Sequence, residues 1–190
     1  MFLEELASRR HLVLSYFYTV NLTLVLSLAR LLESRGEEVC IIHDERIRWN
    51  LAPFTVNLKC SPNSVNLVFE AESELEVPKD FLLVTSNRNL KLHDATTLRL
   101  SKVKEGIFMA LGEGAKFTFR ISANGVEDYE ERKSDVIKIL EELGGEATLQ
   151  DIVNISSKRL NLSREMVREE LGFLARTGKI VIKKNVVRLA

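Results

Sequence analysis

Two apolar runs in the first half of the chain end in acidic residues that could perform chemistry. Asp44 and Glu45 follow the run Glu38–Ile42, and Glu70 closes the run that begins at Val65. Open α/β sheets place functional groups at the carboxyl ends of their strands, where a carboxylate could activate water or hold magnesium beside a phosphate. Because no phosphate-binding loop stands opposite, we interpret Asp44 and Glu45 as solvated surface residues and Glu70 as part of an acidic turn.

The segment that would have to bind phosphate lies between the apolar run Leu12–Phe17 and the Leu-rich run Leu22–Leu32. A phosphate-binding loop offers glycine amides, a lysine for the terminal phosphates and a Ser or Thr for magnesium. The break between the runs reads SYFYTVNL at residues 15–22 and contains neither Gly nor Lys. We therefore predict a degenerate nucleotide loop without a cofactor, a metal or a catalytic residue. The residues assigned to this loop are Ser15, Tyr18, Asn21 and Leu22.

The elements that position these residues follow from apolar patterning. The stretch His11–Trp49 has the strand, turn, helix, strand order of a parallel α/β unit, and Val65–Glu70 and Phe81–Thr85 predict two more strands. Three short runs at 98–101, 106–111 and 116–121 have the spacing of antiparallel edge strands. Residues 1–130 are therefore predicted to form an α/β domain with a mainly parallel central sheet. Its helix near Leu22–Leu32 is apolar on nearly all sides, so we expect a second protein surface or the tail domain to cover it.

A membrane anchor is an alternative interpretation of the first apolar run. Leu12–Ala29 contains no charged residue and follows Arg9 and Arg10, the pattern of a spanning segment with a basic flank. Asn21 and several Ser and Thr hydroxyls interrupt this run, and strand patterning resumes directly after Gly36. We therefore favour a buried strand and helix and expect no membrane partner.

Bulk composition is that of a globular protein with a mildly basic tail. The formal net charge is zero, with 27 Lys+Arg and 27 Asp+Glu, and the residues from 131 onward carry the excess of basic over acidic side chains. Cys40 and Cys60 show no CxxC spacing, so we expect neither a metal site nor a disulfide, in a reducing cytoplasm. Abundant Glu, Lys and Arg beside a single Gln, Gln150, are typical of proteins from hot environments.

Residues 8–130 resemble the core of the RecA/RadA recombinases, chiefly the archaeal RadA proteins. The segments that carry the resemblance are TSNR at 85–88, HDATTLRL at 93–100, GEGAKFTFRI at 112–121 and GVED at 125–128. The segment ERIRW at 45–49 is similar to the family's second core strand with its catalytic acid. The resemblance implies a RecA-like ATPase core.

This sequence departs from that family where the nucleotide and DNA would bind. Asn21 takes the place of the phosphate lysine, and Leu22 takes that of the magnesium Ser or Thr. Arg88 stands near the Gln that couples nucleotide state to DNA, and the DNA-binding loop that should follow is cut to Asn89–Leu92. The F-x-x-A segment for polymerisation is missing. We therefore expect an inactive ATPase core that forms no recombinase filament.

The tail, residues 131–190, resembles a winged-helix domain. Its pattern predicts a helix over Ser134–Leu143, a second helix capped at Thr148, a third capped at Ser163, and a hairpin around Lys183-Lys184-Asn185. In winged helices that bind DNA, the third helix enters the major groove and the hairpin contacts phosphate. The residues predicted to contact DNA are Arg164, Arg168, Arg176, Lys183, Lys184 and Arg188.

These features predict a non-catalytic RadA-like accessory protein in DNA repair or recombination. Its expected partners are DNA, single- or double-stranded, and a recombinase or repair protein, with a homodimer as a further option. A winged-helix transcription regulator, whose core serves dimerisation or ligand sensing, is the alternative. An interaction module whose winged helix binds protein and a weak enzyme that uses Asp44 or Glu45 are two others.

Overall fold

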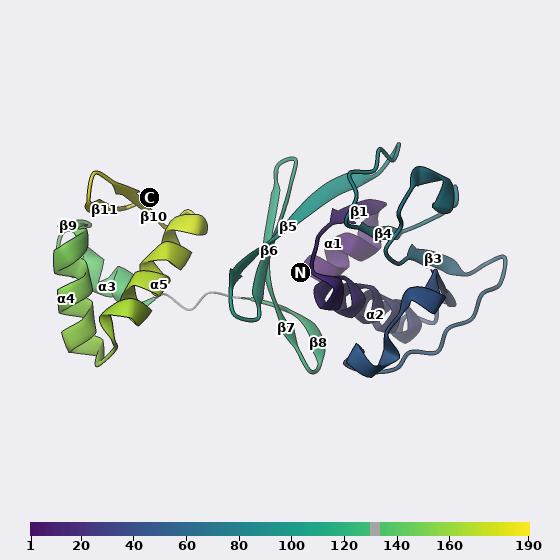
Figure 1. The fold of residues 1–190 in the computed structure, drawn as a ribbon, viewed down its shortest axis with the longest axis horizontal. Coiled ribbons are helices and arrows are strands. Elements are labelled where there is room, and N and C mark those ends of the chain that lie inside the picture. Colours follow the sequence, from purple (N-terminus) through teal and green to yellow (C-terminus); the bar gives the residue numbers. More distant parts are fainter. Residues whose placement is uncertain (130–133) are drawn as a thin grey trace. The chain divides into compact units, whose positions relative to one another are not determined.

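The chain forms two compact units, Met1–Glu130 and Glu131–Ala190. The computed structural model describes residues 1–129 and 134–190 (Figure 1). Each unit has its own sheet and its own buried core.

The first unit is built on one eight-stranded sheet with the strand order β2-β3-β4-β1-β5-β6-β7-β8. Its elements are α1 (Phe2–Ser8), β1 (His11–Leu14), α2 (Tyr18–Ser34), β2 (Val39–Ile42), β3 (Val65–Val68), β4 (Leu83–Ser86), β5 (Thr96–Lys104), β6 (Ile107–Gly112), β7 (Ala115–Ser122) and β8 (Gly125–Asp128). Strands β2, β3, β4, β1 and β5 run parallel, and β6, β7 and β8 continue from β5 as antiparallel neighbours. The predicted mixed α/β class with a mainly parallel sheet is confirmed.

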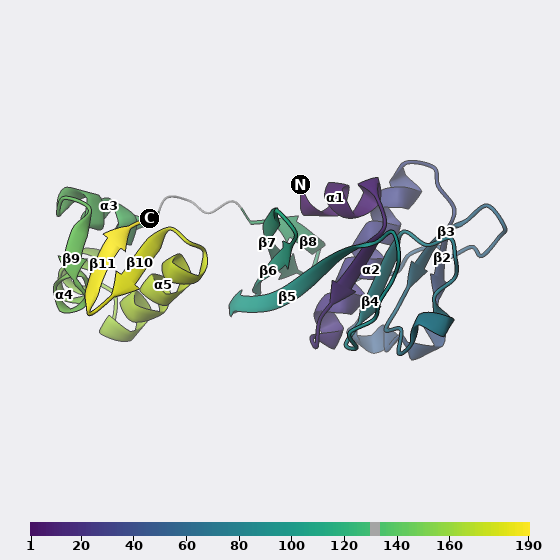
Figure 2. The same ribbon diagram turned by 90° about the horizontal axis from the view of Figure 1, so that it is seen from above.

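Strand β1 lies inside the sheet with a parallel neighbour on each side. Val13 pairs with Thr85 of β4 and with Leu98 of β5. Figure 2 shows β5 running on from beside β1 toward the antiparallel strands. Because β1 to β4 run parallel, their carboxyl ends lie along one edge of the sheet. Ligands of open α/β sheets bind at such an edge.

Helix α2 is the main cover of one sheet face. Between Tyr18 and Ser34 the sequence has no Gly or Pro and is rich in leucine, a strong helix former. Its completely buried apolar side chains are Leu22, Leu24, Val25, Leu26, Leu28 and Ala29, and full burial of a leucine-sized side chain is worth roughly 1.5–3 kcal/mol. Gly36, with φ of +83°, accepts the left-handed conformation that follows the end of the helix.

The cover of the outer side of α2 comes from the first unit itself. Helix α1 packs on α2 through Phe2 and Leu6, which are completely buried. Part of the β2–β3 connection adds Phe54, whose ring lies 3.8 Å from the Arg30 guanidinium carbon. The expectation that a second protein or the tail must cover this helix was wrong, because the long connection and the N-terminal helix supply the apolar surface.

The opposite face of the parallel strands is covered by loops. Leu12, Leu14, Val68 and Val84 point to this side and pack with Leu90 and other apolar side chains from the connections. The connections from β2 to β3 and from β3 to β4, both fully described, contain only short 3₁₀ turns. This face therefore has a much smaller core than the face under α2.

The membrane-anchor alternative is contradicted by the fold. The uncharged run Leu12–Ala29 is divided between strand β1 and helix α2, with a turn between them. Within residues 1–129 and 134–190 no helix has the length and hydropathy that a bilayer crossing requires.

A disulfide joins Cys40 of β2 to Cys60 of the following connection, across a sequence separation of 20 residues. The expectation of unpaired cysteines was wrong. The irregular segment after β2 turns back along its own strand, where the Lys59 amide donates to the Val39 carbonyl at 2.9 Å. This return brings the two sulfurs together, and spacing along the chain does not reveal it.

The second unit contains three helices and a three-stranded sheet of order β10-β11-β9. Its elements are α3 (Asp135–Glu142), β9 (Glu146–Thr148), α4 (Leu149–Leu160), α5 (Arg164–Arg176), β10 (Ile180–Lys183) and β11 (Val186–Leu189). The predicted caps are confirmed, since Thr148 Oγ1 accepts from the Asp151 amide at 3.1 Å and Ser163 Oγ accepts from the Met166 amide at 3.2 Å. Strand β9 was not predicted from the sequence.

Loss of the disulfide should destabilise the first unit. In the Cys40→Ser/Cys60→Ser variant the unfolded chain regains the freedom of a loop of about 20 residues, which costs roughly 3 kcal/mol of folding free energy. Guanidinium denaturation of the oxidised protein and of the variant measures this difference. Reductant should lower the stability of the wild-type protein and leave that of the variant unchanged, and equal stability of the two oxidised proteins would contradict the role of the crosslink.

Candidate functional site

The connection from β1 to α2 is too short to be a phosphate-binding loop. Only Ser15–Phe17 separate strand from helix, whereas the G-x-x-x-x-G-K-[ST] pattern needs about eight positions. The Phe17 amide already donates to Ser15 Oγ at 3.0 Å, and the Ser15 amide donates to the Ser86 carbonyl at 2.9 Å. The turn is thus held closed by its own hydrogen bonds.

Asn21 fixes the start of α2 to the sheet edge. Its side chain is completely buried, and Nδ2 donates to the Ser15 carbonyl at 3.2 Å and to Glu70 Oε1 at 2.6 Å. Asn21 Oδ1 is buried without a hydrogen-bond partner among the described residues. An amide therefore joins the turn after β1 to the carboxylate after β3. Leu22, the next residue of the predicted loop, is completely buried in the core.

Glu70 is part of this connection, and its interpretation as a simple acidic turn was wrong. It has φ of +52°, and its amide donates to Thr85 Oγ1 of β4 at 3.0 Å. This backbone conformation turns the half-buried side chain toward Asn21. Burial raises the pKa of the Glu70 carboxyl above its ordinary value, and the bond from Asn21 opposes this shift.

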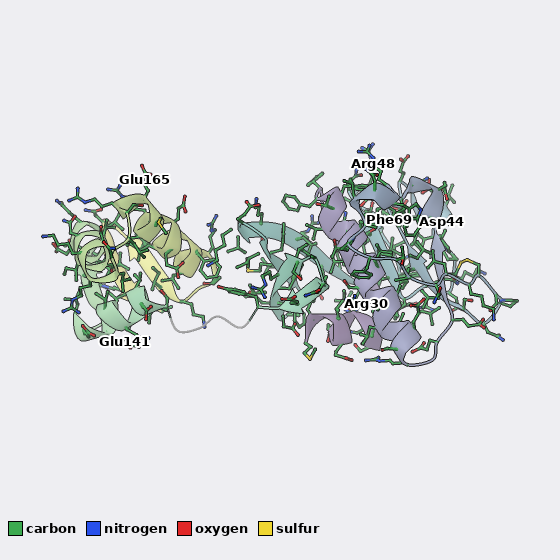
Figure 3. The ribbon with its side chains drawn as sticks, turned by 90° about the horizontal axis from the view of Figure 1, so that it is seen from below. Arg30, Asp44, Arg48, Phe69, Glu141 and Glu165 are labelled. Carbon is green, nitrogen blue, oxygen red and sulfur yellow. A yellow bond between two sulfur atoms is a disulfide. The ribbon has the colours of Figure 1, made fainter. Side chains whose placement is uncertain are left out.

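Tyr18 closes the other side of the turn. Its hydroxyl donates to the Arg46 carbonyl at 2.9 Å and accepts from the Arg48 amide at 2.7 Å. Its ring packs edge-on against Phe69, with 5.4 Å between centroids, and the Arg48 guanidinium carbon lies 5.4 Å from the Tyr18 ring centroid. Figure 3 shows Arg48, Phe69 and Asp44 at the same end of the first unit. Tyr18 thereby links the start of α2 to the segment after β2.

Arg46 and the carboxylates around it neutralise one another. Arg46 Nη1 donates to the Glu70 carbonyl at 2.6 Å and to Glu76 Oε2 at 2.9 Å. The Arg46 guanidinium lowers the pKa of the Glu76 carboxyl. Asp44 and Glu45 are exposed, as predicted, and Glu45 Oε1 lies 3.1 Å from His43 Nδ1. In the part of the chain that the structure describes, no cluster of His, Cys, Asp or Glu has the arrangement of a metal site.

In the second unit, Arg164 and Arg168 line a cleft of about 250 Å³. They lie one turn apart near the start of α5. Gln150 and Asn154 of α4 and Asn185 of the hairpin turn also line it, so three elements converge there. No carboxylate lines this cleft, and neither arginine has an ion pair among the described residues. Two guanidinium groups beside three amides are suited to an anionic, hydrogen-bonding ligand.

The other four predicted contact residues lie elsewhere. Arg176 is exposed near the C-terminal end of α5, about 18 Å along the helix axis from Arg164 at 1.5 Å per residue. Lys183, Lys184 and Arg188 line a separate, mainly apolar groove of about 590 Å³ with Val181, Val186 and Leu189. Arg188 already pairs with Glu146, 2.8 Å between Nε and Oε2. Of the six predicted residues, two therefore line the α5 cleft and three line the groove on the hairpin.

No protein-family model matches this chain, and no curated protein sequence is significantly similar to it.

Sequence reasoning missed several residues at both sites. Gln150, Asn154 and Asn185 line the α5 cleft, and a small hint was present in the sequence, because Asn185 occupies the centre of a two-residue turn with Lys184. The left-handed φ values of Lys184 and Asn185, +47° and +67°, are those of the tight hairpin turn that Asn favours. Nothing in the sequence indicated that Glu70 would bond Asn21, since they are 49 positions apart.

The raised pKa of Glu70 predicts a specific pH dependence of stability. The folded state holds this proton more tightly than the unfolded state, so the stabilising contribution of protonated Glu70 is complete below the unfolded pKa and is lost as pH rises through the folded pKa. Glu70→Gln keeps an acceptor for Asn21 without a charge. Chemical denaturation should therefore find the variant more stable than wild type at neutral pH.

This advantage should shrink as the pH falls through the raised pKa of folded Glu70, and it should be lost below the ordinary carboxyl pKa of 4.5. Glu74→Gln is the matched control, because burial contributes little at this exposed site and other interactions lower the pKa of Glu74. A Glu70→Gln variant with the same pH profile as wild type would contradict the assignment of a raised pKa.

Proposed function

We propose that this protein is a non-catalytic accessory factor in DNA repair or recombination. Residues 1–130 would be a RecA/RadA-like core that has lost its nucleotide site, and residues 131–190 a winged-helix domain that binds duplex DNA. The single observation that carries the proposal is the α5 cleft, where Arg164 and Arg168 stand beside three amides without a carboxylate.

The filled edge of the sheet supports the non-catalytic part of the proposal. Strand β1 lies at a point where the chain departs in opposite directions across the sheet, which is where related folds bind nucleotides. Here the three-residue turn, the buried Asn21 amide and the Tyr18 hydroxyl bonds occupy that place. A triphosphate would have to displace these bonds, and Asn21 offers no positive charge in return.

The placement of charge on α5 supports DNA contact by the second unit. Successive helix residues are about 100° apart around the axis, so Glu165 and Glu169 lie on a different stripe from Arg164 and Arg168. Figure 3 shows Glu165 on the outside of α5. The cleft therefore keeps its positive potential. Arg and Asn or Gln are the side chains that read guanine and adenine edges in the major groove.

A protein partner for the core is supported by its exposed apolar side chains. Leu75 is 97% exposed and lies between Glu74 and Glu76, and Trp49 and Leu51 are also exposed. Such side chains together with acidic neighbours are suited to a partner with apolar and basic residues. We assign a recombinase or repair protein to this role on the strength of the resemblance alone.

A second candidate function is protein binding by the tail. The groove on the hairpin has mainly apolar walls formed by Val181, Val186 and Leu189. Apolar side chains contribute nothing to phosphate binding, but they can pack against a bound protein. In this version Lys183 and Lys184 would flank a bound protein segment.

The cytoplasmic location that we propose agrees with the Cys40–Cys60 disulfide in a hyperthermophilic organism. Disulfides are rare in the reducing cytosol of organisms from moderate temperatures but common inside cells of hyperthermophiles. The Glu-, Lys- and Arg-rich composition agrees with such a source.

The full-length protein should not bind ATP. Isothermal titration with ATP and magnesium should give no saturable heat at millimolar nucleotide, because Asn21 and Tyr18 are held in hydrogen bonds at the place of the phosphates. Titration with ADP, which has the same base and ribose but lacks the γ-phosphate, tests separately for binding through the base and ribose. Micromolar affinity for ATP, or its hydrolysis, would overturn the non-catalytic assignment.

Charge reversal of Arg164 and Arg168 should weaken duplex binding. Loss of a bidentate base contact costs about tenfold or more, and each lost phosphate contact lowers the slope of log affinity against log salt by about one. Fluorescence anisotropy with a labelled duplex, at several salt concentrations, measures both effects for Arg164→Glu and Arg168→Glu.

Arg159→Glu is the matched control, because this exposed arginine lies on α4 and pairs with Glu142. Equal loss in all three variants would indicate only a general charge effect. Unchanged affinity in Arg164→Glu and Arg168→Glu would remove the α5 cleft as the DNA contact, and failure of the wild-type protein to bind duplex at low salt would favour the protein-binding alternative.

A further inference from the structure

A second basic cleft lies in the first unit at the carboxyl ends of β1 and β4, beside the middle of β5. It has a volume of about 180 Å³. Its polar lining consists of Ser15, Tyr16, Asn87, Arg88, Asn89 and Arg99, and none of the lining residues is acidic. The three strands are neighbours in the sheet, in the order β4-β1-β5. Residues more than 80 positions apart in the chain therefore share one small concave surface.

The two arginines of this cleft keep their charge. Arg99 Nη2 donates to Asn89 Oδ1 at 3.2 Å, a neutral acceptor. Neither Arg88 nor Arg99 forms an ion pair with a described carboxylate. Most other basic side chains of this unit have acidic partners, as Arg46 has with Glu76. Two unneutralised guanidinium groups at one cleft attract an anion, and phosphate is the anion that matches their fork geometry.

Tyr16 adds an aromatic surface to this charge. Its side chain is 87% exposed, although both neighbours are fixed by backbone bonds, Ser15 to Ser86 and Phe17 to Ser15 Oγ. The backbone thus holds the ring out in solvent. Tyr18 provides the contrast, because its hydroxyl is bonded to Arg46 and its ring packs on Phe69. Exposing an aromatic ring to water is unfavourable compared with burying it, and a ring this exposed contributes little to packing.

We propose that this cleft binds single-stranded nucleic acid. One base would stack on Tyr16, Arg88 and Arg99 would hold the adjoining phosphates, and the amides of Asn87 and Asn89 would bond to the base or sugar. Exposed aromatic rings beside cationic side chains are the combination that binds unpaired strands with little sequence preference. A duplex hides the faces of its bases in the stack and offers none to Tyr16. This site is distinct from the duplex contact proposed for α5 and does not depend on it.

The test uses the full-length protein and a labelled dT oligonucleotide of about 15 nucleotides, a length within the usual site sizes for single strands. Fluorescence anisotropy at low salt gives the affinity. Tyr16→Ala should weaken binding by roughly tenfold or more, whereas Tyr16→Phe, which keeps the stacking ring, should restore it. Arg88→Gln and Arg99→Gln should each weaken binding and lower its salt dependence.

Arg35→Gln is the matched control, since it removes one exposed arginine that pairs with Glu4 elsewhere in the unit. It should leave dT affinity unchanged. The same variants are measured with a labelled duplex, which Tyr16→Ala should bind as wild type does. The pair Arg164→Glu and Arg168→Glu should show the reverse pattern, so failure of either site is seen separately.

Photo-crosslinking with bromodeoxyuridine in the same oligonucleotide gives an independent location. Mass spectrometry should find the crosslink on the peptide that contains Tyr16. Equal dT affinity of wild type and Tyr16→Ala, or crosslinks confined to residues 131–190, would overturn the proposal. Binding of dTMP as tight as that of the oligonucleotide would also overturn it, because the ligand would then be a free nucleotide.

Discussion

The first unit depends on the bridge that Asn21 forms between the turn after β1 and the carboxylate after β3. One buried amide group bonds the Ser15 carbonyl and Glu70 Oε1 together, and so fixes where α2 starts above the sheet. A lysine at this position would bring a charge into the same buried place, whereas the neutral amide satisfies the neighbouring oxygens without an ion. The bridge therefore has a structural role at the start of α2.

Helix α2 can be almost entirely apolar because it is covered on both sides. The sheet buries one side, and α1 and the segment around Phe54 bury the other. The opposite sheet face has only loops and a smaller core. The disulfide ties the longest of these irregular connections back to β2. A long loop costs much conformational entropy to order, and a crosslink reduces the part of that cost that arises in the unfolded chain.

The two basic clefts are lined by the same kinds of side chain, although they lie in different units. In each, neighbouring elements bring arginines and amides together without a carboxylate. These arginines are Arg164 and Arg168 on α5, and Arg88 and Arg99 beside the end of β1. The clefts differ in the exposed ring of Tyr16, which suits unpaired bases, and in the helix of the α5 cleft, which suits a groove. The proposed protein would thus offer separate contacts for duplex and single strand.

Local sequence patterns predict most of the helices and strands and the lack of a phosphate loop. Apolar runs, the Thr148 and Ser163 caps and the stop at Gly36 are local signals, because strand periodicity and helix capping involve residues within a few positions of one another. The tertiary structure alone decided the Asn21–Glu70 bridge, the Cys40–Cys60 pairing, the cover of α2, the third strand of the tail sheet, and the grouping of the basic residues. These features join residues 20 or more positions apart, and the path of irregular loops, which carries no periodic signal, sets which of them meet.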